Sequence, residues 1–167
     1  MNKFKGIIFD LDQTLVDSSI AQHARDQRNW QRVYSLIPSF RLYDGWKVVF
    51  EEIQKFGIKC CVVTNSPSVY ASKVIKYFNI PSDFVIGYHD VRRRKPNPDP
   101  IILAISKLQL NPEVVVSIGD RADDIYASNM AKTKSVACLW GAEEKDDLIN
   151  STPTFIIKSP TELLNIL

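Results

Sequence analysis

The sequence predicts an α/β fold: a doubly wound, Rossmann-like parallel sheet with helices on both faces and a minimal helical insert. Two observations support this fold class. Short apolar runs of strand length alternate with segments of helical periodicity along most of the chain. The strand-like runs are apolar at nearly every position, which is typical of parallel strands that are buried on both faces.

Length and composition indicate one domain. The 167 residues suit a single compact domain, and the 45% of apolar residues can fill one core. We therefore expect one domain over 1–167, with the short insert at about 19–44. The formal net charge of +2 is too small to indicate a nucleic-acid or membrane partner by bulk electrostatics.

The order of strands and helices follows from the apolar pattern. Strands are expected at 4–9, 58–64, 84–87, 113–119, 135–140 and 154–158. Helices are expected at 45–57, 68–79, 98–110, 121–132 and 161–167. The first of these helices ends at Gly57, and the second stops before Pro81. Pro98 and Pro100, in the first turn of the third helix, favour its start.

The cysteines and the first apolar run bear on location. Cys60, Cys61 and Cys138 lie inside apolar runs and lack the spacing of metal ligands. We interpret them as buried thiols of a protein in a reducing cytoplasm. The first apolar run ends after Phe9, which is too short for a signal peptide, and no later stretch could span a bilayer. A cytoplasmic protein without a membrane partner is therefore expected.

Polar side chains gather at the carboxyl ends of the predicted strands, where open α/β sheets bind their ligands. In chain order they are Asp10, Asp12, Thr14, Thr64, Asn65, Lys95, Asp120, Asp123 and Asp124. Asp10 and Asp12 pose a problem, because two carboxylates two residues apart repel each other and burial would increase that repulsion. A bound divalent cation would offset it.

Four segments of the sequence resemble the motifs of one enzyme family. They are "DLDQT" at 10–14, "VVTNS" at 62–66, the lysine of "RRKPNPDP" at 93–100 and "GDRADD" at 119–124. In order and context they resemble the haloacid dehalogenase-like hydrolases, within the branch of phosphoglycolate phosphatase-like enzymes. One such motif alone would be a weak signal, but four in order, each after a predicted strand, are a strong one.

The resemblance implies a phosphoric monoester phosphatase, with a role for each aspartate of the first motif. Asp10 would be the nucleophile that forms an aspartyl-phosphate. Asp12 would be the general acid/base, which protonates the leaving oxygen and then activates water. Family members that release halide or cleave carbon–phosphorus bonds typically lack an aspartate at this position, so Asp12 favours hydrolysis of a phosphate ester.

The resemblance also implies Mg²⁺, a hard ion that prefers carboxylate oxygens and water. Its expected ligands are Asp10, the backbone carbonyl of Asp12, Asp120 and Asp124, the last either directly or through water. Asp123 is the third choice among the acidic residues of the last motif, because it also fits a helix N-terminus.

The remaining motif residues would bind the phosphoryl group. Thr64 and Asn65 would hold a phosphate oxygen, and a helix N-cap at Thr64 or Ser66 is a compatible alternative. Lys95, as both a catalytic and a substrate-binding residue, would offset negative charge on Asp10 and on the phosphoryl group. Thr14 would support the loop through its hydroxyl.

The segment 19–44 departs from the family pattern, because phosphoglycolate phosphatase-like enzymes usually carry a cap of several dozen residues there. We expect one helix that ends before Pro38, with Trp30, Val33, Tyr34 and Ile37 on one stripe. Arg25, Arg28 and Arg32 lie elsewhere on this helix. So reduced a cap would leave the site open to a phosphorylated small molecule or to an exposed phosphate on a larger substrate, unless a homo-oligomer covers it.

Two other functions are alternatives. The first is a 3′- or 5′-phosphatase acting on nucleotides or nucleic-acid ends, with Trp30 as a stacking surface. Against it, Trp30 shares the apolar stripe of its helix, so nucleic acid is not the favoured partner. The second is a non-catalytic binding or regulatory module, which the complete carboxylate set argues against.

Overall fold

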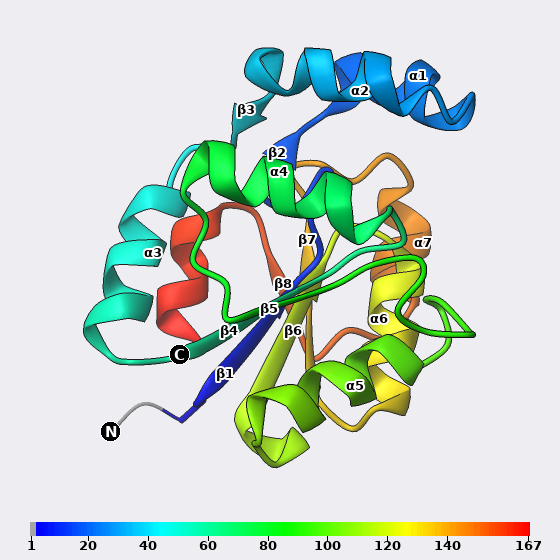
Figure 1. Cartoon of the computed structure of the whole chain (residues 1–167). Helices are drawn as coiled ribbons and strands as arrows, with labels where there is room; N and C mark the ends of the chain where they lie inside the picture. The colour runs from blue at the N-terminus through cyan, green and yellow to red at the C-terminus, as the bar shows by residue number, and fades with distance from the viewer. Residues whose placement is uncertain (1–2) are drawn as a thin grey trace.

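The computed structural model describes residues 3–167 and contains a six-stranded parallel sheet (Figure 1). The strand order is β5-β4-β1-β6-β7-β8, and every neighbouring pair is parallel. The strands are β1 (Gly6–Phe9), β4 (Lys59–Val63), β5 (Phe84–Ile86), β6 (Val115–Gly119), β7 (Lys134–Cys138) and β8 (Phe155–Ile157). The predicted doubly wound fold is therefore confirmed.

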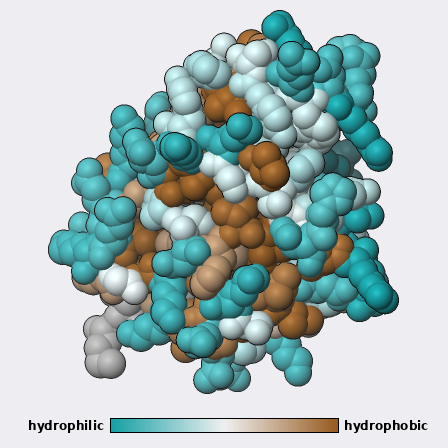
Figure 2. All heavy atoms as spheres, viewed as in Figure 1, coloured by the Kyte–Doolittle hydropathy of each residue, from teal (hydrophilic) through white to brown (hydrophobic). Residues whose placement is uncertain are grey.

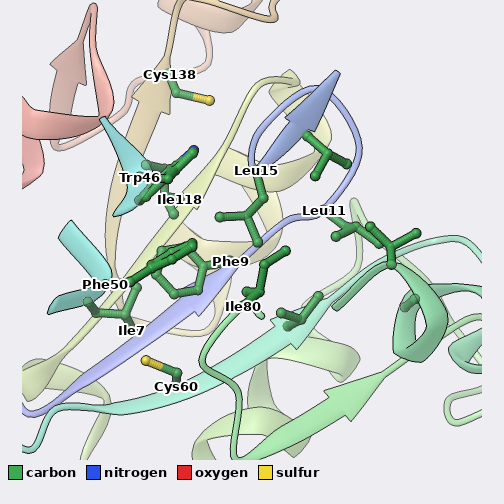
Figure 3. Packing of buried hydrophobic residues seen from close by; sticks show 14 of the residues in the cluster. Ile7, Phe9, Leu11, Leu15, Trp46, Phe50, Cys60, Ile80, Ile118 and Cys138 are labelled. Carbon is green, nitrogen blue, oxygen red and sulfur yellow. The ribbon is translucent and has the colours of Figure 1, made fainter. Parts of the chain in front are cut away.

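Helices cover both faces of the sheet, because successive strand residues point to opposite sides. On β1, Ile7 and Phe9 pack in the cluster that contains α3 (Trp46–Lys55) and α4 (Ser68–Phe78). Ile8 packs in the cluster that contains α5 (Asp99–Leu108) and part of α6 (Ala122–Met130). Figure 1 shows α3 and α5 on opposite sides of the strands, and Figure 3 shows Phe9 beside Trp46 and Phe50. Aliphatic and aromatic packing on both faces fixes the strands that carry the site.

Two helical segments differ from the expectation. The segment expected as a helix at 161–167 is a 3₁₀ helix, η4 (Pro160–Asn165), with proline at its first position. A helix that the pattern did not predict, α7 (Lys145–Asn150), has six residues and buries only Leu148. Its polar sequence resembles a solvated loop, so periodicity gave no signal. The strand expected at 113–119 also begins two residues later, because Glu113 and Val114 belong to a short 3₁₀ helix, η3 (Pro112–Val114).

The insert contains two short helices rather than the one that was expected. They are α1 (Gln22–Asp26) and α2 (Trp30–Leu36), flanked by η1 (Ser19–Ala21) and η2 (Ile37–Ser39). The break occurs at Arg28, which has a left-handed φ of 55°, and Asn29 then caps α2 by accepting the Arg32 N–H. The prediction of a single helix is wrong, because a local turn and a cap interrupt the helical pattern.

The base of the insert is tied to the domain. β2 (Val16–Asp17) pairs antiparallel with β3 (Arg41–Leu42), which brings the two ends of the insert together. Val33, Ile37 and Phe40 are buried in the cluster that includes α3 and α4. The insert is therefore packed against the domain, and Figure 1 shows it beyond α4.

The structure tests the predictions about the cysteines and about membrane-spanning segments. Cys60, Cys61 and Cys138 are free and buried, as expected. None of the helices in residues 3–167 has both the length and the apolar character needed to cross a bilayer. On the face drawn in Figure 2, apolar patches are separated by hydrophilic side chains.

Candidate active site

The centre of the sheet brings the predicted site residues to one edge. β1 lies between β4 and β6, so the residues that follow these three strands are neighbours. Asp10 continues the pairing beyond β1, because its N–H donates to the Ile118 carbonyl at 2.9 Å. After β1 the chain adds β4 and β5 on one side of it, and then crosses over to add β6, β7 and β8 on the other side. Ligands of open α/β sheets bind at such a switch point.

Three carboxylates and one ammonium form the centre of the site. Asp10, Asp120 and Asp124 each place one oxygen so that all three atoms lie within 4.8 Å of one another. The Lys95 ammonium donates to Asp10 Oδ1 at 2.8 Å, to Asp124 Oδ1 at 2.6 Å and to the Val63 carbonyl at 3.0 Å. The Thr14 hydroxyl lies 2.9 Å from Asp120 Oδ1 and 3.2 Å from Asp10 Oδ2, which fits the predicted support of the loop.

Burial and mutual repulsion change the protonation of these groups. Burial raises the pKa of Asp10 to about 6, an effect that Lys95 opposes and Asp124 reinforces. Burial, with repulsion from Asp10 and Asp124, raises the pKa of Asp120 to about 9. Burial lowers the pKa of Lys95, but attraction to Asp10 and Asp124 outweighs it and raises the pKa overall, so the ammonium stays charged. One cation therefore faces three carboxyl groups, whose mutual repulsion favours a proton on Asp120 in the metal-free protein.

This donor set fits Mg²⁺. Hard divalent cations take carboxylate oxygens, and a dication would offset the negative charge that Lys95 alone leaves. Among the described residues, these three aspartates form the one group of acidic, histidine or cysteine side chains whose ligand atoms lie close enough together to hold a metal ion. Asp123 lies outside the group, although it lines the same cavity.

Gly119 makes room for Asp124. A Cβ at Gly119 would lie 2.3 Å from the side chain of Asp124, a distance at which atoms cannot coexist. Asp124 is also fixed at the start of α6, because its Oδ2 accepts the Arg121 N–H at 3.1 Å. The glycine before the acidic residues therefore lets this carboxylate lie against the end of β6.

The Asp12 carboxylate lies in a different environment from Asp10. Its Oδ1 accepts from the Ser18 and Tyr70 hydroxyls, each at 2.6 Å, and its Oδ2 accepts from Ser66 at 3.3 Å. Arg25 of α1 completes the set by an ion pair with Asp12 Oδ1. Repulsion by Asp12 is the smallest of the main influences on the pKa of Asp10, so the expected Asp10–Asp12 conflict is minor.

Thr64 and Asn65 brace the backbone of the site. The Thr64 hydroxyl accepts the Ser66 N–H at 3.0 Å. The alternative of a helix N-cap at Thr64 or Ser66 is wrong, because α4 begins after Pro67 without a side-chain cap. The Asn65 amide donates to the Lys95 carbonyl at 3.0 Å and so fixes the loop that carries the lysine. Both residues line the cavity described next.

A cavity of about 570 Å³ lies above these residues and reaches the insert. Its floor contains the three carboxylates and Lys95. Its wall on the insert includes Gln22, Arg25, Arg28 and Trp30. The volume is within the range of small-molecule sites.

Several residues of the site escaped prediction from sequence. The Thr14 carbonyl accepts two indole N–H groups, from Trp46 at 3.0 Å and from Trp140 at 2.9 Å. Tyr70 is fully buried on the apolar face of α4, so its periodicity signals only core packing. Arg25 shared its sequence context with two other arginines, and nothing local distinguished it. These contacts join segments far apart in the chain, and no local pattern records them.

Comparison with known proteins gives matches over most of the chain. A family model described as haloacid dehalogenase-like hydrolase matches residues 23–138. A phosphoglycolate phosphatase of Salmonella paratyphi A is 33% identical over 110 residues, which are 65% of this chain and 44% of that enzyme. A pyrophosphatase, PpaX, of Anoxybacillus flavithermus is 28% identical over 151 residues, 82% of this chain and 70% of that protein. The chain thus spans less than half the length of the first of these relatives.

Solved structures share this fold over almost the whole chain, and one of them illustrates the likeness. It is a protein of Haemophilus somnus described as a predicted phosphoglycolate phosphatase. The TM-score is 0.87, the identity is 23%, and the match covers 99% of each chain. At this identity the likeness supports the fold alone. The family match begins at residue 23, so Asp10 and Asp12 lie outside it. Their roles are therefore inferred from their geometry in the site.

Proposed function

The chain belongs to the haloacid dehalogenase-like hydrolases, and we propose that it is a Mg²⁺-dependent phosphatase that hydrolyses a phosphate monoester through an aspartyl-phosphate on Asp10. One observation carries this proposal. Asp10 follows the central strand at the switch point, beside a buried ammonium and two further carboxylates. Titratable groups with shifted pKa values cluster at functional sites, and phosphoryl transfer uses charged groups of this kind to stabilise its transition state.

The residues divide the reaction into two steps. A carboxylate oxygen of Asp10 attacks phosphorus, the bond from phosphorus to the ester oxygen breaks, and Asp12 gives its proton to that oxygen. Asp12 then takes a proton from water, whose oxygen attacks phosphorus and breaks the bond to Asp10. Inorganic phosphate leaves, and both aspartates return to their starting states.

Lys95 stabilises charge during both steps. Its ammonium holds one oxygen of Asp10 and so orients the carboxylate. The same positive charge lies where negative charge gathers on the phosphoryl oxygens, an arrangement that lowers the barrier most in a water-poor site. We assign Thr64 and Asn65 to the substrate-binding edge on the support of their place in the cavity wall.

The metal would be held by Asp10, the Asp12 carbonyl and Asp120, with Asp124 as a further or indirect ligand. When bound, Mg²⁺ supplies positive charge that shields the attacking carboxylate and the phosphoryl group from each other. The clustered oxygens and the raised pKa values of Asp10 and Asp120 support a cation site.

The substrate is proposed to be a phosphorylated small molecule. The relatives are named for phosphoglycolate and for pyrophosphate, which are both small. The cavity volume of about 570 Å³ suits a ligand of that size. Trp30 packs against Tyr70, with ring centroids 5.7 Å apart, so its ring has a packing role that weakens the nucleic-acid alternative.

Turnover of an aryl phosphate tests the proposal. Wild-type protein should release phosphate in Mg²⁺, stop when a chelator is added in excess, and resume when Mg²⁺ is restored. Asp10→Asn should release none under any of these conditions. Full activity in chelator would contradict the metal requirement, and activity of Asp10→Asn would contradict the nucleophile.

A further inference from the structure

Arg25 is the residue of the insert that reaches the reacting groups. It lies on α1, and its guanidinium forms an ion pair with Asp12 Oδ1. The side chains are only 10% and 16% exposed, so water screens this pair less than a surface pair. Its second terminal nitrogen donates to Gln22 Oε1 at 2.5 Å. A guanidinium has five N–H donors, and these two contacts leave others for a ligand.

Arg25 and Lys95 lie at the two functional ends of the site. Lys95 contacts Asp10, the proposed nucleophile, and therefore marks where the transferred phosphoryl group lies. Arg25 contacts Asp12, the proposed acid for the leaving oxygen, and therefore marks where the leaving group lies. Both cations line the same cavity. Two fixed positive charges on either side of the bond to be broken are complementary to a substrate with two anionic groups.

We propose that Arg25 binds a second anionic group on the leaving group and so selects short, doubly anionic substrates; this inference rests on the proposed function. The direct contact between Arg25 and Asp12 limits how far the second anionic group can lie from the ester oxygen of the substrate. A group that meets Arg25 while its ester oxygen meets Asp12 must be joined to that oxygen by a short link. A carboxylate one carbon away, or the second phosphate of pyrophosphate, satisfies this condition. A long or neutral leaving group does not.

The other arginines of the insert do not have this position. Arg32 is exposed on α2 and does not line the cavity. Arg28 lines the cavity but is exposed, in the turn between the two helices. A guanidinium that is both sheltered and paired with Asp12 loses less entropy on binding, and a planar fork matches a carboxylate or phosphate.

A matched pair of substrates separates recognition from support of Asp12. In 2-phosphoglycolate the leaving group ends in a carboxylate, and in ethyl phosphate a methyl group takes its place. We compare kcat/KM for the two in Mg²⁺. Wild type should prefer 2-phosphoglycolate, and Arg25→Gln should reduce that preference by about 10- to 100-fold, as for a hydrogen-bonded charge. Arg25→Lys should restore part of it.

Two control variants define a merely structural effect. Tyr70→Phe removes another donor to Asp12. It should lower kcat/KM for both substrates by the same factor, without changing the preference. Arg32→Gln should leave the preference at its wild-type value. If Arg25→Gln also lowers kcat/KM for both substrates by the same factor, Arg25 only positions Asp12, and the inference is overturned.

Binding keeps the inference testable if wild type hydrolyses neither compound, a result that would contradict the proposed function. Calorimetry on Asp10→Asn, in Mg²⁺, measures affinity without turnover. This variant should bind 2-phosphoglycolate at least about tenfold tighter than ethyl phosphate, and adding Arg25→Gln should abolish the difference. Equal affinities in the presence of Arg25 would overturn the inference.

Discussion

Lys95 Nζ lies 2.8 Å from Oδ1 of Asp10, although 85 positions separate the two residues in the chain. The lysine is buried and also contacts Asp124, so the carboxylates of this cluster neutralise its charge in place of water. This pair joins the loop after β5 to the end of β1. It is the contact on which the charge balance of the site depends.

Lys95→Met tests that balance. Without the ammonium, buried carboxylates lose their partner, and we expect the metal-free protein to lose about 3 kcal/mol of unfolding free energy. Turnover of an aryl phosphate should fall about 100- to 1,000-fold. Urea unfolding and steady-state kinetics measure the two effects. Arg93→Gln, which removes an exposed ion pair between this loop and Asp99 at the start of α5, is the control and should change neither.

Asp10→Asn should separate stability from function. The raised pKa of about 6 means that the folded metal-free protein holds this proton more tightly than the unfolded chain does. Ionised Asp10 therefore destabilises the fold increasingly from about pH 4 to pH 6, and by a constant amount above. In chelator at pH 8 the variant should be about 1–3 kcal/mol more stable than wild type, and at pH 4 about equal.

The same variant should respond weakly to Mg²⁺. Wild type at 100 times its dissociation constant should gain about 2.7 kcal/mol, and Asp10→Asn should gain much less at the same concentration. Thermal unfolding with and without chelator measures both. A wild-type protein that Mg²⁺ does not stabilise would contradict the metal site.

Asp12→Asn should affect substrates according to their leaving groups. An alkyl phosphate needs a proton on its leaving oxygen, so its first turnover should slow about 100- to 10,000-fold. An activated aryl phosphate needs little protonation, so its first turnover should stay close to the wild-type rate. Stopped-flow measurement of the first turnover distinguishes the two. An equal loss for both substrates would argue against a role as acid.

Gly119→Ala should displace Asp124. The added methyl group would overlap the Asp124 side chain, which Lys95 and the Arg121 N–H hold in place, so we expect a loss of about 1–3 kcal/mol and weaker Mg²⁺ binding. Gly6→Ala is the control at the start of β1, since its methyl group would crowd the side chains of Leu110, Val115 and Leu108 but no residue of the site, so Mg²⁺ binding should not change. Unaltered Mg²⁺ binding in Gly119→Ala would show that Asp124 does not support the metal.

Local pattern was enough to predict the sheet and the polar edge. The runs around Ile8, Val62 and Ile118 have the length of strands and are apolar throughout, which is typical of parallel strands buried on both faces, and parallel strands bring their carboxyl ends together. The sequence alone therefore predicts that Asp10, Lys95 and Asp120 meet at this edge. These residues are far apart in the sequence, and the parallel sheet alone is enough to bring them together.

The insert and the surroundings of Asp12 could not be predicted in the same way. A left-handed residue at Arg28 broke the expected helix, and a helical stripe does not reveal such a turn. Tyr70 and Arg25 meet Asp12 through side chains from α4 and α1, and those contacts depend on how the helices pack. Burial of Val33 and Phe40 also shows that this segment cannot be replaced by a linker without exposing core.

The covalent intermediate tests the central claim most directly. Asp12→Asn is mixed with an aryl phosphate that is radiolabelled in its phosphoryl group, because this variant should form the phosphoenzyme and hydrolyse it slowly. Acid quench and peptide mapping then locate the label. We predict a base-labile phosphoryl group on the peptide that contains Asp10, and none in the Asp10→Asn/Asp12→Asn double variant. Release of phosphate with no labelled protein, or a label on another residue, would contradict it.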